Sequence, residues 1–203
     1  MDKKQVLYIH GGESFLNYDD FLDRLRSIEL RNVEVNKKIK WSHTLADDLG
    51  DDFSVILPQM PNSENAKYSE WEIWFERHLT LLKNDAVLIG CSLGAMFLAK
   101  YLIDKETPLE VSKLILMASP VEGDKDEYYK DCEDFVFPLA KVQNLLDRVD
   151  EVHIWHSKDD FLVPYEHGLR FSRALPEAVF TTFTDKNHFL VSELPELIEL
   201  IKN

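Results

Sequence analysis

The sequence predicts an α/β fold, namely a three-layer α/β/α sandwich built on a mostly parallel sheet of about six strands. Short apolar, β-branched runs alternate with amphipathic helical patterns along the chain, which is typical of repeated strand–helix units. The chain has 203 residues, 45% of them hydrophobic, which is enough for one packed core. We therefore expect a single domain over residues 1–203.

Six segments have the length and composition of β-strands. In chain order they are Val6–His10, Phe53–Leu57, Ala86–Ile89, Lys113–Met117, Val152–Trp155 and Val179–Phe183. The third and fourth contain continuous apolar runs, which indicates parallel strands covered on both faces.

Helical patterns lie between these strands. Ser69–Glu72 has the Ser-x-x-Glu form of a capping box, and apolar residues follow it at helical spacing. Phe21–Ile28 and Leu194–Ile201 are amphipathic. Ala95–Ile103 is apolar nearly all round, as expected of a helix packed against a sheet.

Two segments fall outside this repeat. Asn32–Leu49 is polar and weakly periodic, which fits a helix plus a loop. The segment at about 121–149 is longer than one crossover helix requires, with an acidic start and an apolar continuation. It is either a small lid over a pocket or an ordinary crossover helix with a solvated acidic loop.

Charge and composition exclude several classes of function. A net charge of −14 and a pI near 4.9 argue against nucleic acid or an anionic membrane as the main partner. Two cysteines are too few for a disulfide framework. The apolar run near the N-terminus is too short for a signal peptide, and no run approaches the roughly 18 apolar residues of a membrane span. We expect a cytoplasmic protein.

A serine lies between two glycines where the third strand should pass into a helix, in Gly90-Cys-Ser-Leu-Gly94. This strand–turn–helix context is what a nucleophile elbow requires. Such a turn strains the serine backbone, and side chains two positions to either side would collide with their surroundings. Cys91 lies one residue from the apex, so we expect it to be buried rather than nucleophilic. The pattern indicates that Ser92 is a nucleophile.

A serine hydroxyl needs a base within hydrogen-bond reach. Of the seven histidines, His188 follows the last expected strand. Its loop should open at the carboxyl edge of the sheet, where Ser92 also emerges. His153 and His156 are spaced as a metal pair could be, but on a strand they would point to opposite faces.

Two adjacent carboxylates, Asp159 and Asp160, follow the fifth expected strand and could orient the base. Here the chain resembles the α/β-hydrolase superfamily, whose acid commonly opens an Asp-x-x-Val-Pro sequence. The match is Asp160, with Asp159 as a solvated or turn-capping neighbour. The order Ser92, Asp160, His188 is the chain order of that fold. Locally the chain resembles the small serine hydrolases of the retinoblastoma-binding-protein-9/YdeN type.

Further motifs carry the same resemblance over nearly the whole chain. His10-Gly-Gly12 matches the His-Gly motif of the family's oxyanion hole, and Leu57–Pro61 matches a Leu-Pro-x-Met-Pro sequence. An oxyanion hole needs two backbone N–H groups. Leu93 would supply one and Gly12 the other, with Glu13 as the alternative if the register differs by one residue. We expect a sheet without the two further N-terminal strands that the usual family members have.

The resemblance implies a carboxylesterase-like serine hydrolase that acts on a small ester, thioester or amide through an acyl-enzyme. We expect a small-molecule acyl substrate, no cofactor and no metal. The alternative is a binding or regulatory module that keeps the hydrolase scaffold with weak or no catalysis. A complete set of nucleophile, base, acid and oxyanion donors favours the enzyme.

Overall fold

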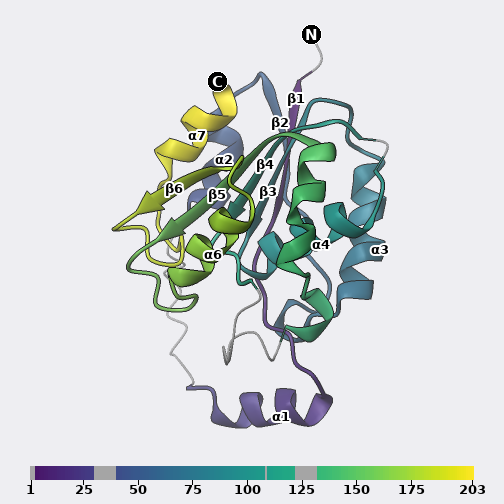
Figure 1. Cartoon of the computed structure of the whole chain (residues 1–203), viewed down its shortest axis with the longest axis vertical. Helices are drawn as coiled ribbons and strands as arrows, with labels where there is room; N and C mark the ends of the chain where they lie inside the picture. The colour runs from purple at the N-terminus through teal and green to yellow at the C-terminus, as the bar shows by residue number, and fades with distance from the viewer. Residues whose placement is uncertain (1–2, 30–39, 108, 122–131) are drawn as a thin grey trace.

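The computed structural model describes residues 3–29, 40–107, 109–121 and 132–203, and six strands within them form one parallel sheet. The strands are β1 (Lys4–Ile9), β2 (Phe53–Ile56), β3 (Ala86–Cys91), β4 (Val111–Met117), β5 (Val149–Ser157) and β6 (Val179–Phe183). Each overlaps a segment in which the sequence predicts a strand. Helices cover both faces of the sheet, so the expected three-layer α/β/α fold is confirmed (Figure 1).

The strand order β2-β1-β3-β4-β5-β6 determines where a site can form. After β1 the chain adds β2 on one side of it, and then adds β3 and the later strands on the other side. In open parallel sheets such a reversal leaves a crevice at the carboxyl ends of the two strands where it occurs, here β1 and β3. Ile9 is paired with Gly90. The segments that follow β1 and β3 therefore begin side by side.

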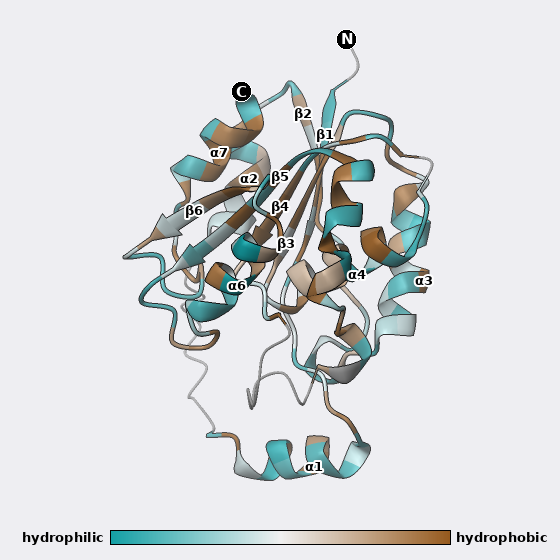
Figure 2. Cartoon of the chain, viewed as in Figure 1, coloured by the Kyte–Doolittle hydropathy of each residue, from teal (hydrophilic) through white to brown (hydrophobic). Residues whose placement is uncertain are grey.

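Most of the helices lie on one face of the sheet or the other (Figure 1). Their bounds are α1 (Tyr18–Ser27), α2 (Trp41–Leu49), α3 (Tyr68–Leu79), α4 (Leu93–Asp104), α6 (Glu166–Ala174) and α7 (Pro195–Lys202). One core lies under α2 and α7, and a larger one lies under α3, α4 and α6. Figure 2 shows apolar residues concentrated in the strands, with polar residues on the outer helix surfaces. α1 has no buried residue.

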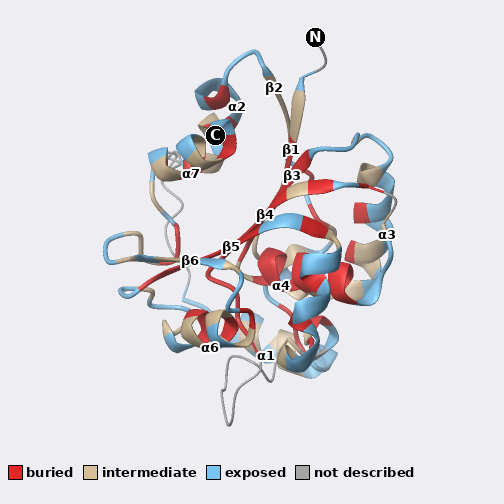
Figure 3. Cartoon of the chain, turned by 45° about the horizontal axis from the view of Figure 1, so that its top comes forward, coloured by how far each residue is buried: buried red, intermediate tan, exposed pale blue. Residues whose placement is uncertain are grey.

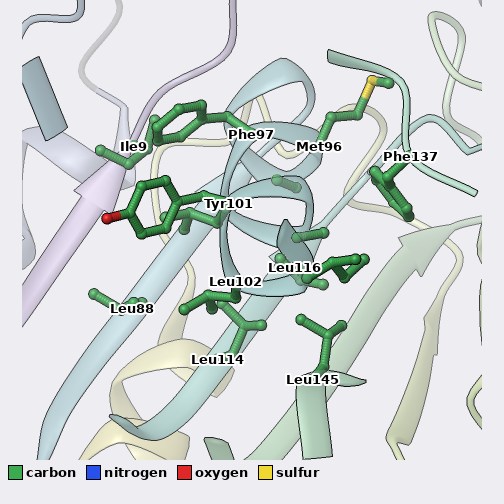
Figure 4. Close-up of a cluster of buried hydrophobic side chains, with 14 of the residues drawn as sticks. Ile9, Leu88, Met96, Phe97, Tyr101, Leu102, Leu114, Leu116, Phe137 and Leu145 are labelled. Carbon is green, nitrogen blue, oxygen red and sulfur yellow. The ribbon is translucent and has the colours of Figure 1, made fainter. Parts of the chain in front are cut away.

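The larger core is built around α4, in which ten of twelve residues are buried. Phe97 and Leu102 lie among side chains from the sheet, and Figure 4 shows this cluster with Leu88 and Leu114 below the helix. Burying one such side chain contributes about 1.5–3 kcal/mol. Figure 3 shows the buried residues as a continuous band through the sheet and α4. The first turn of α4, which follows Ser92, is thereby held rigidly.

The structure corrects two expectations about helices. α3 begins at Tyr68 with Lys67 as its N-cap, so Ser69 lies inside the first turn and does not form the expected capping box. The main-chain N–H groups of Glu70 and Trp71 both donate to the Lys67 carbonyl at 3.1 Å, which closes that turn earlier. α6 has no counterpart among the expected helices; it is a short and mostly polar helix that contains a glycine and buries His167, Gly168 and Phe171.

The two segments outside the repeat are described in part. Trp41–Leu49 forms α2, and residues 30–39 lie outside the described residues. Of the segment expected at about 121–149, residues 122–131 are likewise outside the described part. The apolar continuation packs into the larger core through Phe135, Phe137 and Val142. Among the described residues, every helix is too short or too polar to traverse a lipid bilayer.

Candidate active site

Ser92 lies at the apex of a tight turn between β3 and α4. Its backbone has φ 55° and ψ −123°, a conformation that L-residues rarely adopt. The Ser92 N–H donates to the Met117 carbonyl at 2.9 Å, and the Ser92 carbonyl accepts from Ala95 and Met96. These bonds hold the strained residue between β4 and the first turn of α4. Such strain persists only where the surroundings enforce it, and it is concentrated at functional sites.

The flanking glycines allow the close backbone packing that this turn requires. A Cβ at Gly90 would lie 2.6 Å from the Ala95 Cα. A Cβ at Gly94 would lie 2.5 Å from the His10 carbonyl oxygen and would also overlap the Ile9 carbonyl. Because those contacts are with backbone, no side-chain rotation would relieve them. The spacing of the glycines thus has the physical cause expected from the sequence.

Asp160 and His188 meet across the ends of β5 and β6. The His188 Nδ1–H donates to the Asp160 carboxylate, at 2.8 Å from one oxygen and 3.0 Å from the other. The Asp160 side chain is fully buried, and its Oδ1 also accepts from the backbone N–H groups of Leu162 and Val163, each at 2.9 Å. These donors compensate for the loss of water around the carboxylate. With the proton on Nδ1, the His188 Nε2 is left unprotonated and can accept one.

Asp159 has different partners from its neighbour. Its Oδ1 accepts from the Asn187 N–H at 2.9 Å and from the Ser157 hydroxyl. Of the two carboxylates, it is Asp160 that bonds the His188 imidazole. The two adjacent aspartates therefore contact the same loop in different ways, one through its imidazole and one through its backbone.

The hydrogen bonds of the backbone N–H groups near Ser92 indicate which of them are free to bind an oxyanion. Leu93 is the first residue of α4, where an N–H has no acceptor within the helix. The Glu13 N–H donates to the Ser63 carbonyl at 2.8 Å, so it is already bonded. Gly12 is therefore the better candidate on the β1 side. Gly11 also lies close, because a Cβ there would be 3.1 Å from the Ser92 Cβ.

His10 supports the loop that carries these glycines. Its Nε2 accepts the Met60 N–H at 2.9 Å, so the proton is on Nδ1, which lies 2.7 Å from the Gly11 carbonyl. The imidazole thus links the end of β1 to the segment after β2. This arrangement orients the loop and gives each ring nitrogen a backbone partner.

Ser92 and His188 both line two adjoining cavities. The larger is about 470 Å³ and includes polar residues such as Lys40 and Gln59 in its wall. The smaller is about 330 Å³ and is lined mostly by apolar groups, including Phe15 and Pro120. Both volumes lie in the range of small-molecule sites, about 300–1,000 Å³. A substrate could therefore extend to either side of the serine.

Cys91 is buried against the larger cavity. Burial, reinforced by the negative charge of Asp160, raises the pKa of its thiol to about 12. The thiol therefore stays protonated at neutral pH, which removes it as a competing nucleophile. In the described part of the chain, no three His, Cys, Asp or Glu side chains are grouped to hold a metal ion.

Two contacts at the site have no signal in the sequence. The Trp41 indole N–H donates to the Phe189 carbonyl at 3.0 Å, so α2 braces the loop that carries His188. The Ser157 hydroxyl accepts the Lys186 N–H at 3.2 Å. Trp41 and Phe189 are 148 residues apart, and local periodicity cannot indicate such a pairing.

Comparisons with known proteins bear on the fold. No protein-family model matches the sequence, and no curated protein matches it either. The crystal structure of the ydeN gene product from B. subtilis matches with a TM-score of 0.70 at 18% identity, covering 98% of this chain and 97% of that one.

Further solved structures also match, and their names state a hydrolase or thioesterase. The 2-hydroxy-6-oxo-6-phenylhexa-2,4-dienoate hydrolase of Rhodococcus sp. strain RHA1 gives a TM-score of 0.63 at 15% identity, covering 99% of this chain and 91% of that one. The thioesterase domain from the curacin biosynthetic pathway gives 0.63 at 12%, covering 99% and 92%. These likenesses confirm the fold that the sequence resemblance implied.

Proposed function

We propose, on the premise of the α/β-hydrolase fold, that the protein is a serine hydrolase that transfers an acyl group to water. In this proposal Ser92 is the nucleophile, His188 the general base and Asp160 the acid that orients the base. Gly12 and Leu93 supply the oxyanion N–H groups. The observation that carries the proposal is that His188, paired with the buried Asp160 carboxylate, lines the same cavity as the strained Ser92.

In the first half of the reaction, the Ser92 oxygen attacks the substrate carbonyl carbon while the His188 Nε2 takes the hydroxyl proton. The carbonyl oxygen becomes an oxyanion that accepts from the two N–H groups. These hydrogen bonds are stronger in the transition state than in the ground state, because the oxygen then carries negative charge. When the intermediate collapses, the bond to the leaving group breaks. The leaving group departs with the proton from His188, and an acyl-serine ester remains.

In the second half, water takes the place of the leaving group. His188 accepts a proton from this water as its oxygen attacks the acyl carbon. The Ser92 oxygen then leaves with that proton, and the carboxylic acid product is released. The Asp160 carboxylate stays ionised throughout and stabilises the imidazolium that forms twice in each cycle.

We propose a small carboxylic ester as the substrate, with a thioester or an amide as the alternatives. The two cavities are of a size to hold an acyl group and a leaving group on opposite sides of the serine. Leu57, Leu162 and Leu190 are partly exposed at the wall of the larger cavity, which favours a substrate with apolar parts. The net charge of −14 disfavours a strongly anionic substrate. The cytoplasmic location expected from the sequence stays a prediction.

A fluorophosphonate probe tests the proposal directly. The activated serine oxygen displaces fluoride from phosphorus, so a phosphonylated Ser92 forms and HF is lost. We expect labelling of the wild type at Ser92, located by peptide mass spectrometry, and none in Ser92→Ala or His188→Ala. Ser42→Ala is the matched control, because Ser42 lines the same cavity outside the elbow and its loss should leave labelling intact.

The outcomes separate the enzyme from its main alternative. Labelling that disappears in Ser92→Ala and His188→Ala supports an activated serine and justifies a screen of esters and thioesters. A folded wild-type protein that is not labelled would contradict the proposal. That result would favour a binding module on a hydrolase scaffold.

A further inference from the structure

Two adjacent aspartates reach the loop that carries His188, and the proposed mechanism uses only one of them. The Asp159 Oδ1 accepts the Asn187 N–H at 2.9 Å and the Ser157 hydroxyl proton. The same Ser157 oxygen accepts the Lys186 N–H at 3.2 Å. A continuous set of hydrogen bonds therefore joins the end of β5 to the loop that follows β6.

This loop needs external support because its backbone is strained. Asn187 has φ 41° and Phe189 has φ 54°, so both neighbours of His188 are in the left-handed region. Non-glycine residues adopt this conformation infrequently, and a bulky residue such as Phe189 keeps it only where surrounding contacts enforce it. The Asp159 carboxylate holds the first of these residues, and the Trp41 indole N–H holds the second through its carbonyl at 3.0 Å.

We infer that Asp159 is a positioning residue, which fixes the backbone on which the His188 imidazole is mounted. The inference rests on the proposed function of His188 as the base. Asp159 acts through the Asn187 N–H, so its contribution is geometric. Ser157 is fully buried at the end of β5, and Asp160 lies three residues further along the chain. The acid and the base are thus tied to one rigid strand end.

The geometry predicts that Asp159 needs an acceptor oxygen and does not need a negative charge. Asparagine at this position keeps an oxygen that can accept from both donors, whereas alanine leaves the Asn187 N–H without this acceptor. Asp160 differs, because its charge faces the imidazole and stabilises the imidazolium. Substitution by asparagine should therefore have a small effect at Asp159 and a large effect at Asp160.

The test measures the second-order rate of fluorophosphonate labelling for Asp159→Ala, Asp159→Asn and Asp160→Asn. Displacing a base by about 1 Å costs up to roughly 100-fold in rate. We expect a 10- to 100-fold loss in Asp159→Ala, recovery to within about threefold in Asp159→Asn, and a loss of several orders of magnitude in Asp160→Asn. Asp185→Ala is the matched control, since this exposed carboxylate of the same loop has Lys186 as its ion-pair partner, at 3.8 Å.

A second readout does not depend on activity. The His188 Nδ1 proton, held by Asp160, should give a downfield proton NMR signal in the wild type. We expect the signal to remain in Asp159→Asn and Asp185→Ala and to be lost or broadened in Asp159→Ala. Ser157→Ala interrupts the same hydrogen bonds from the other side, and it carries the test if Asp159→Ala does not fold.

Each result is decisive. An Asp159→Ala protein that keeps both the wild-type labelling rate and the Nδ1 signal overturns the inference. So does an Asp159→Asn protein as impaired as Asp160→Asn, because it would show a need for charge. If the wild type is not labelled but the signal follows the expected pattern, the proposed function fails while the positioning role stands.

Discussion

Replacing Gly94 by alanine brings two effects on stability into opposition, a gain in helix propensity and a steric overlap with the neighbouring backbone. Gly94 lies in the first turn of α4, where replacing glycine by alanine would ordinarily stabilise a helix by up to about 1 kcal/mol. The backbone packed around Gly94 predicts that alanine destabilises the protein here. A Cβ at Gly94 would lie 2.5 Å from the His10 carbonyl oxygen, whereas ordinary contact starts at 3.4 Å. The two groups would have to separate by about 0.9 Å.

That displacement is costly because the obstructing atoms are backbone of β1 and of the residue after it. Overpacking of this kind costs about 1–3 kcal/mol, and here we expect the upper end because backbone cannot rotate away. Subtracting the gain in helix propensity leaves Gly94→Ala less stable by about 2 kcal/mol. For a chain of this size, the midpoint of thermal unfolding should fall by about 4–8 °C.

Urea unfolding followed by circular dichroism measures this free energy. Ala46→Gly, at an exposed position in α2, provides the propensity effect alone and should destabilise by about 1 kcal/mol. Gly94→Ala should also slow fluorophosphonate labelling, since the displaced His10 segment leads directly to Gly12. A Gly94→Ala protein as stable as the wild type, or more so, would refute the packing argument.

Two further predictions concern protonation. Burial lowers the pKa of His156 below its ordinary 6.5, so the unfolded state binds a proton more readily and stability falls as the pH drops below 6.5. The free energy of unfolding should therefore change by at most about 1.4 kcal/mol per pH unit because of this histidine. Unfolding curves measured at several pH values should lose this dependence in His156→Gln and keep it in His43→Gln, since His43 is exposed. Equal pH profiles for the two variants would contradict the prediction. A thiol pKa raised from 9.0 to about 12 lowers the fraction of Cys91 present as thiolate at pH 8 by roughly 10³. Iodoacetamide should therefore modify Cys91 far more slowly than the partly exposed Cys132, and peptide mass spectrometry measures both rates. Comparable rates would show that Cys91 is accessible and ionised.

Local features of the sequence are sufficient to predict the fold and the turn at Ser92. Strand runs and helical periodicity depend on which face of each element is buried, and neighbouring residues show this directly. The elbow is also local, because Gly90 and Gly94 are required within two residues of Ser92. Short-range patterns failed at element ends. The helix α3 begins at Tyr68 because its backbone closes an earlier turn, despite the capping sequence that starts at Ser69.

The tertiary structure decided which of several chemically equivalent groups occupies each position. By sequence, Asp159 and Asp160 are two adjacent carboxylates, and their partners in the loop after β6 are 28 residues away. The residues alone leave the choice between Gly12 and Glu13 open, and in the structure the Glu13 N–H already donates to the Ser63 carbonyl. Hydrogen bonds between distant segments depend on where the sheet brings those segments together. Composition and spacing specify the groups, and only the folded backbone selects which donor meets which acceptor.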